Sequence, residues 1–353
     1  MRPPHPLKDI AAQAGLSEAT VDRALHGRSN VSAAAVRAVE QAVLELDRQQ
    51  SQLRLGARTV LVDVVMQAPA RFTGAVRTAL EAELAWVRPA AVRARFHLRE
   101  RADVEELVET IDRVGSGGRT SQGLLLKAPD DPAIAAAVDR AAGRGIPVVT
   151  LVTDVPSSRR VAYVGLDNQQ AGATAAFLVS RWLTPRGVGD GEGRRVLVTM
   201  SRSTFLGEHE RVRAFEDELA VLRPEEPVLV VSDADGLDAA TGDLVGPALD
   251  EEPGVCAVYS VGGGNRATLA ELRRRGRRVE AYVAHDLDED NVALLRSGAI
   301  DAVIHHDLQS DCRRAVRQVL RHHRLVSGAP LTVPASLEII TRYNLPTRWI
   351  DPA

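Results

Sequence analysis

The feature that most restricts the fold is a regular alternation of apolar strand-like runs and helix-like segments, which starts near residue 59. Strands are predicted at TVLVDVV (59–65), near residues 92–98, at GLLLKAP (123–129) and at IPVVTLV (146–152). Apolar residues at helical spacing fall between them, through residues 76–84, 104–111 and 133–143. Strands that alternate with helices pair in parallel, and the helices cover both faces of the sheet. The pattern therefore predicts an α/β fold with a buried parallel sheet.

The same organisation starts a second time at AYVGLDN (162–168). The strand-like runs RRVLVTM (194–200), PVLVVSD (227–233), AVYSVGGG (257–264) and VEAYVAHD (279–286) alternate with helical segments near 207–220, 237–250 and 265–275. At 353 residues the chain is longer than one core usually supports, so two or three domains are expected. Two α/β lobes that face each other would bind a small molecule at the carboxyl ends of their strands.

Ahead of this body, residues 7–46 are predicted to form three short helices around a small core. Gly15 ends the first helix, and Ser17 stands where the N-cap of the second belongs. A helix, a short turn with glycine and a second helix is the arrangement that lays its second helix into the major groove of DNA. A plain helical hairpin is the alternative. The outward side of the second helix favours DNA binding, because Arg23 could pair with guanine, and Ser17, Thr20 and Asn30 with phosphates.

The segment LKDIAAQAGLSEATVDRALHGRSNVS (7–32) closely resembles the N-terminal DNA-binding segment of the LacI/GalR family of bacterial transcription regulators. The family pattern is matched at Leu7, Asp9, Ile10, Ala11, Ala14 to Ser17, Thr20, Val21, Arg23, Val31 and Ser32. The DNA-contacting residues that this resemblance and the pattern imply are Leu7, Ser17, Glu18, Ala19, Thr20, Arg23, His26 and Asn30.

Two departures from the family pattern bear on DNA binding. Asp22 stands where the family usually has Ser, which brings a negative charge near the phosphates. The family continues into a hinge helix whose leucines wedge into the minor groove, but this chain has LELDRQQSQLRLGART (44–59) there, about three residues shorter. Leu53 or Leu55 would supply the wedge.

The resemblance covers nearly the whole chain and implies its domain organisation. A helix-turn-helix domain is expected over residues 1–47, an atypical hinge or linker over 48–59, and an effector-binding and dimerisation domain over 60–353. The chain of such a body crosses between the lobes three times, and we place the crossings near Gly165, Asp290 and Ser327. Lobe 1 would then comprise about 60–165 and 291–326, and lobe 2 about 166–290 and 327–353.

Six residues are expected to contact the effector. The resemblance implies Arg211, which matches a family arginine that reaches into the cleft, together with Asn265 and Asp286, which suit ligand hydroxyls. Position alone adds Phe72, Asp154 and Phe205, each in a loop after a strand. Small local cores are the alternative explanation for these three. Asp167 and Asn168 are expected to organise the first lobe crossing and cap the next helix.

Composition and motifs argue against several other classes. The sequence has no run of 18 apolar residues and no secretory signal, so we expect a cytoplasmic protein. Two separated cysteines indicate buried thiols, and the His305-His306 and His322-His323 pairs are expected to be solvated, so no metal is expected. The glycine-rich segments lack phosphate-loop spacing, and no nucleophile elbow or H-E-x-x-H motif occurs, so neither a cofactor nor enzyme activity is expected.

These observations together predict a DNA-binding transcription regulator, a repressor rather than an activator. Its partners would be double-stranded operator DNA, a sugar, polyol or sugar acid in the cleft, and a second copy of the chain in a homodimer, with a tetramer left open. Residues 1–60 carry eight Lys/Arg against six Asp/Glu, in a chain of net charge -3, which permits DNA binding without requiring it. A solute-binding protein and an α/β enzyme with a helical appendage are the alternatives.

Overall fold

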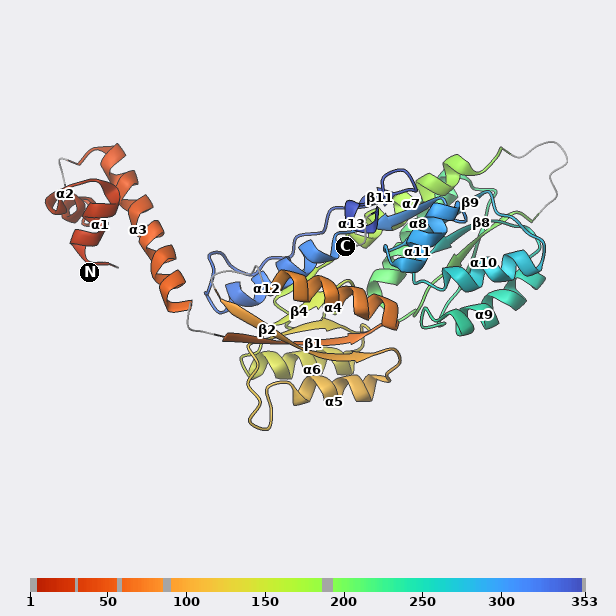
Figure 1. Cartoon of the computed structure of the whole chain (residues 1–353), viewed down its shortest axis with the longest axis horizontal. Coiled ribbons are helices and arrows are strands. Elements are labelled where there is room, and N and C mark those ends of the chain that lie inside the picture. Colours follow the sequence, from red (N-terminus) through yellow and green to blue (C-terminus); the bar gives the residue numbers. More distant parts are fainter. Residues whose placement is uncertain (1–4, 29–30, 56–58, 85–89, 186–192, 351–353) are drawn as a thin grey trace.

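Three helices form a small N-terminal unit that lies apart from a larger α/β body (Figure 1). The computed structural model describes residues 5–28, 31–55, 59–84, 90–185 and 193–350. The three helices are α1 (Leu7–Ala14), α2 (Glu18–Leu25) and α3 (Ala33–Leu55), and their shared core includes Ile10, Val21 and Val39. Gly15 ends α1 with a φ of 65°, and Ser17 caps α2 by accepting from the Thr20 amide, as the sequence predicts.

The third helix is longer than the sequence pattern indicates. α3 continues from the head to Leu55, so most of the segment expected to be a linker has a helical backbone. The side chains of residues 48–58 lie outside the described part of the structure, and so do residues 56–58 as a whole. Leu53 and Leu55 therefore lie on the last turns of α3, but their proposed contacts with DNA rest on the sequence alone.

The first lobe is built on a five-stranded parallel sheet of order β2-β1-β3-β4-β5. Its strands are β1 (Thr59–Gln67), β2 (Ala91–Arg99), β3 (Gly123–Lys127), β4 (Val148–Leu151) and β5 (Ala162–Val164). α4 (Ala70–Leu84) and α12 (Leu308–His322) pack on one face, and α5 (Val104–Arg113) and α6 (Pro132–Gly143) on the other. Burial on both faces explains why the strands read as continuous apolar runs.

The second lobe is built on a six-stranded sheet of order β11-β10-β9-β8-β6-β7. The strands are β6 (Arg195–Thr199), β7 (Val228–Val231), β8 (Val255–Ser260), β9 (Ala281–His285), β10 (Ala302–His305) and the antiparallel edge strand β11 (Glu338–Ile340). α7 (Asn168–Trp182) and α8 (Leu206–Leu222) cover one face. α9 (Asp238–Glu251), α10 (Asn265–Arg274) and α11 (Glu289–Ser297) cover the other, and α13 (Thr347–Ile350) follows β11.

The crossings between the lobes differ in one place from those expected. The first comes between β5 and α7, and the last between α12 and β11. The middle crossing, however, follows β10 rather than Asp290, because α11 packs in the second lobe and β10 pairs with β9. Residues 291–305 thus belong with lobe 2, since the apolar faces of α11 and β10 are buried there.

Candidate functional site

A cleft lies between the lobes, where strands of both sheets end. Its lining comes directly after β1, β3, β4, β6, β8 and β9, at the carboxyl ends of parallel strands. It is formed by Ala68, Pro69, Arg71, Phe72, Lys127, Val152, Thr153, Ser201, Phe205, Glu208, Arg211, Val261, Gly262, Gly263, His285, Asp286, Asp288 and Asn291. The enclosed volume is about 60 Å³. Ordinary ligand pockets hold about 300 Å³ or more, so the lobes are closed upon each other.

Four of the six effector residues expected from the sequence line this cleft. They are Phe72, Phe205, Arg211 and Asp286. Phe205 is 3% exposed and comes just before α8, whereas Phe72 lies in the first turn of α4 and also packs against the core of lobe 1. These four residues bring two aromatic faces and two charged groups to the cleft.

Arg211 is held in place by α7. Its side chain is 2% exposed, and its Nε donates to Asn168 Oδ1 at 2.9 Å. The two helices approach closely at Gly172, where a Cβ atom would lie 2.1 Å from the Arg211 carbonyl oxygen. Asp167 caps α7 by accepting from the Gln170 amide. The Asp167-Asn168 pair thus fixes both the start of α7 and the direction of the arginine.

Asp286 is part of a buried ion-pair chain. His306 Nε2 faces Asp286 Oδ1 at 3.3 Å, and His306 Nδ1 bonds to Asp311, which also accepts from Arg314 Nη2 at 2.7 Å. Burial alone would lower the pKa of His306, but the two carboxylates outweigh it and raise the pKa to about 9. Burial likewise opposes ionisation of Asp286, yet the His306 contact holds its pKa below the ordinary value. An imidazolium therefore neutralises Asp286 from behind the cleft.

Lys127 is a cleft residue that the sequence analysis missed. It is the last residue of β3, and its Nζ donates to the Gln67 carbonyl at 3.2 Å and lies 3.6 Å from the centre of the Phe205 ring. Burial lowers its pKa to about 8, with a smaller contribution in the same direction from the Arg211 charge, while Glu208 and Asp286 act in the opposite direction. The signal was present in the sequence, because a lone lysine ends the otherwise apolar run GLLL.

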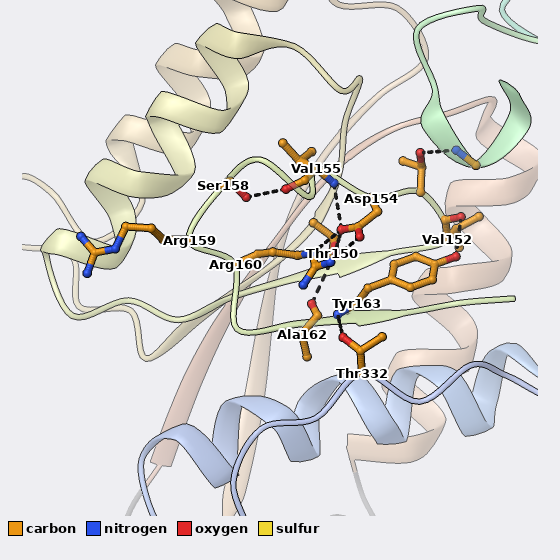
Figure 2. A network of polar contacts seen from close by, with 12 residues as sticks. Thr150, Val152, Asp154, Val155, Ser158, Arg159, Arg160, Ala162, Tyr163 and Thr332 are labelled. Carbon is orange, nitrogen blue, oxygen red and sulfur yellow. Dashed lines mark hydrogen bonds and ion pairs between the residues drawn. The ribbon is translucent and has the colours of Figure 1, made fainter. Parts of the chain in front are cut away.

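Two other expected effector residues have different surroundings. Asn265, the first residue of α10, accepts from Tyr282 Oη at 3.0 Å and donates to Asn291 Oδ1 at 2.7 Å. It lies behind Asn291, which does line the cleft. Asp154 turns toward its own lobe, where it pairs with Arg160 and accepts from Thr150 Oγ1 at 2.6 Å (Figure 2). A partner only six residues away explains why Asp154 is directed away from the cleft.

The remaining polar cleft residues were not anticipated either. Arg71 on α4 pairs through Nε with Asp288 at 3.0 Å, and Glu208 accepts from the Ser201 amide at 2.6 Å. His285 is bonded through Nε2 to Tyr259 Oη at 2.7 Å. Burial and the Arg211 charge hold the pKa of His285 well below its ordinary value, so its ring is neutral.

Contacts across the cleft keep the lobes together. Arg71 also donates to the Gly236 carbonyl of the other lobe at 2.9 Å, and the Gly207 amide donates to Thr153 Oγ1 at 3.2 Å. At the crossing strands, the Tyr163 amide donates to Thr332 Oγ1 at 2.9 Å, which ties the first connection to the last (Figure 2). These contacts must change when the cleft opens.

The N-terminal head presents one face of α2 to solvent. Ser17, Glu18, Ala19, Arg23 and His26 are exposed, Thr20 and Leu7 are half-buried, and Asn30 lies outside the described residues. Asp22, the unusual residue of this helix, pairs with Arg28 at 3.0 Å and lies 3.1 Å from His26 Nδ1. Its negative charge is therefore countered within the head, which reduces the repulsion expected against a phosphate.

The histidine pairs and the cysteines are placed as follows. His305 and His306 are buried at the end of β10, so the expectation that they are solvated was wrong, because that stretch is a central strand. Cys256 and Cys312 are buried free thiols, as expected. Among the described residues, no cluster of side chains suits a metal ion, and no helix there is long and apolar enough to cross a bilayer.

Two family models match the chain. One, described as bacterial regulatory proteins of the lacI family, matches residues 6–48, and the other, described as a periplasmic binding protein domain, matches residues 64–324. The first match covers the three-helix head, and the second covers most of the two-lobed body. Comparison with curated proteins gave no match.

Solved structures with the same fold cover most of the chain. A putative LacI transcriptional regulator from Bacteroides fragilis is 15% identical, with a TM-score of 0.68 over 81% of this chain and 98% of that one. A solute binding protein of an ABC transporter from Burkholderia graminis C4D1M, in complex with D-arabinose, is 20% identical, with a TM-score of 0.71 over 83% and 98%. GanP, a glucose-galactose binding protein from Geobacillus stearothermophilus, is 18% identical, with a TM-score of 0.70 over 82% and 99%. At these identities the likeness establishes the fold.

Proposed function

The chain belongs to the lacI family of bacterial regulatory proteins and carries a periplasmic binding protein domain behind its DNA-binding head, and from this premise we propose that it is an effector-controlled repressor. It binds operator DNA in the cytoplasm as a homodimer. A small sugar, polyol or sugar acid binds between the lobes and changes the operator affinity. Proteins of this fold that bind glucose, galactose or D-arabinose support that class of effector.

The exposed face of α2 carries the DNA-binding part of the proposal. Arg23 and Glu18 are exposed on one short helix whose opposite side is anchored by Val21 in the head core. Arg23 suits the acceptors of guanine, and Glu18 suits the amino group of cytosine. One such helix reads only half of an operator. The two heads of a homodimer would therefore read a pseudo-palindromic operator.

The cleft supplies the control. The cleft is lined by α4 from lobe 1 and by α8 from lobe 2, so a bound effector can change the angle between the lobes. In a dimer, such a change would also alter the separation of the two heads. A coupling free energy of about 1–3 kcal/mol is ordinary for such a switch. A ligand that favours the DNA-incompetent arrangement acts as an inducer, and one that favours the competent arrangement acts as a corepressor.

Fluorescence anisotropy with DNA from upstream of the gene tests the proposal. We expect tight binding at moderate salt that one compound of a sugar, polyol and sugar-acid panel changes, and we expect Arg23→Ala to weaken it. Arg119→Ala removes the same charge from an exposed position in lobe 1 and serves as the matched control. Binding no tighter than to random DNA in every condition would instead favour a solute-binding protein without operator function.

A further inference from the structure

The carboxylates that line the cleft are already engaged by groups of this chain. Asp286 faces the buried His306 imidazolium, and Asp288 pairs with Arg71 at 3.0 Å. Glu208 accepts from a backbone amide and a hydroxyl at the end of β6. Glu208 and Asp288 are thereby occupied and are poor sites for the hydroxyl groups of a neutral sugar, whereas Asp286 Oδ1 has no hydrogen-bond partner among the described residues and can accept from one ligand hydroxyl.

The two most buried cations of the cleft are in the opposite situation. Lys127 and Arg211 have no carboxylate partner among the described residues. Lys127 donates to one backbone carbonyl, that of Gln67, and Arg211 donates through Nε to the neutral amide of Asn168. Both side chains are buried, at 6% and 2% exposure. In addition to burial, the Arg211 charge lowers the pKa of Lys127, while Glu208 and Asp286 raise it from a distance without forming an ion pair with it.

Two buried cations that line one enclosed space repel each other, and an anion in direct contact with both of them would lower that cost further than the more distant Glu208 and Asp286 do. We infer that the effector carries a carboxylate that Lys127 and Arg211 bind together, so that the regulator responds to a sugar acid rather than to a neutral sugar or polyol. A carboxylate matches the planar guanidinium and accepts from the ammonium in charge-assisted hydrogen bonds. The inference rests on the proposed function only for the position of the effector in the cleft.

A carboxylate is the smallest anionic group that a sugar derivative carries. A carboxylate occupies about the same space as the hydroxymethyl group that it replaces on a polyol. The neighbouring His285 has a buried Nδ1 without a hydrogen-bond partner among the described residues, which leaves a position for one ligand hydroxyl.

The lysine content allows a direct test. Lys8 and Lys127 are the only lysines of the sequence, so protein made with lysine labelled at Cε with carbon-13 gives two lysine signals. Lys127→Met assigns them.

The titration of the Lys127 signal then reports whether an anion binds beside it. In chloride we expect this signal to titrate near pH 8. With gluconate, galactonate, glucuronate or galacturonate, we expect at least one acid to raise the titration midpoint by about one pH unit or more. The matched neutral compounds glucitol, galactitol, glucose and galactose should leave it unchanged. A midpoint that no acid raises, or that a neutral compound raises equally, overturns the inference.

Calorimetry with the acid that shifts the lysine signal tests the second half of the argument. Lys127→Met should weaken acid binding roughly 10- to 100-fold, and Lys8→Met, in the head, should not change it. At pH 8, binding to the wild type should take up about half a proton, which buffers of different ionisation enthalpy reveal, and the uptake should vanish in Lys127→Met. Acid binding that survives Lys127→Met unchanged contradicts the assignment.

Failure of this inference is separable from failure of the proposed function. A neutral sugar that binds tightly and alters operator affinity would overturn the acid effector and leave the regulator intact. An acid that binds through Lys127, in a protein that ignores operator DNA, would do the reverse.

Discussion

Replacing Lys127 with methionine should stabilise the protein without effector at neutral pH. Methionine keeps the length of the side chain and its contact with the Phe205 ring, but removes the buried charge. The substitution loses one hydrogen bond to the carbonyl of the buried Gln67, which costs about 1–3 kcal/mol. We expect the relief from burying an ammonium to exceed it.

The magnitude follows from the displaced pKa. Lys127 ionises near 8 in the folded protein against 10.5 for a free lysine, and at 1.36 kcal/mol per unit the charged form costs the fold about 3 kcal/mol. Because the folded pKa is the lower one, the unfolded chain binds more protons between pH 8 and pH 10.5. The stability of the wild type should therefore rise through that interval, relative to the variant. About 2 kcal/mol of the difference should disappear between pH 7 and pH 9.5.

Urea denaturation of both proteins at several pH values, followed by circular dichroism, measures this difference. Subtracting the two free energies of unfolding cancels the groups that titrate equally in both proteins, so only Lys127 contributes. A difference that stays constant with pH would refute the reasoning, because it would mean that the buried amine is not destabilised in the fold. A wild type that is more stable than Lys127→Met at neutral pH would refute it as well.

Three further predictions concern other parts of the molecule. Glu18→Gln should relax the preference at one operator position, by about 1–3 kcal/mol, in a selection from randomised DNA, and unchanged preference would remove Glu18 from base reading. Gly172→Ala should force α7 and α8 apart and lower the stability by about 1–3 kcal/mol in a denaturant titration, whereas Gly74→Ala, where a Cβ meets nothing within 4 Å, should not lower it. His306→Gln should be less stable than the wild type at pH 6, and this difference in stability should shrink by pH 9. The reason is that a histidine with a raised pKa contributes stability below pH 6.5 that is lost as the pH passes 9. Equal stability differences in thermal melts at both pH values would contradict the pairing of His306 with Asp286.

The layer structure could be predicted because burial on both faces leaves an unmistakable pattern. β3 and β8 are buried along their whole length and read as apolar runs. β10 is equally buried, but it is short and ends in histidine, so its place in the sheet was missed. That single omission produced both the misplaced middle crossing and the solvated reading of His305 and His306.

The cleft was harder to predict, because its chemistry depends on which groups of the chain pair with each other. Arg211 and Asp286 could be identified from the family pattern, and both line the cleft. The pairing of Asp154 with Arg160 leaves no local sequence signal, and neither does the position of His306 behind Asp286. Lys127 could have been found, since a charged residue at the carboxyl end of a buried strand faces the ligand edge of a parallel sheet.

The narrowness of the cleft also has a consequence in time. A six-carbon compound does not fit into about 60 Å³, so it enters only while the Arg71 and Thr153 contacts between the lobes are broken. Opening of this kind takes microseconds to milliseconds. The observed association rate should then stop rising at high effector concentration, where it equals the frequency of opening. The rate at which the effector binds would then be set by the opening of the lobes, and its affinity by the side chains inside the cleft.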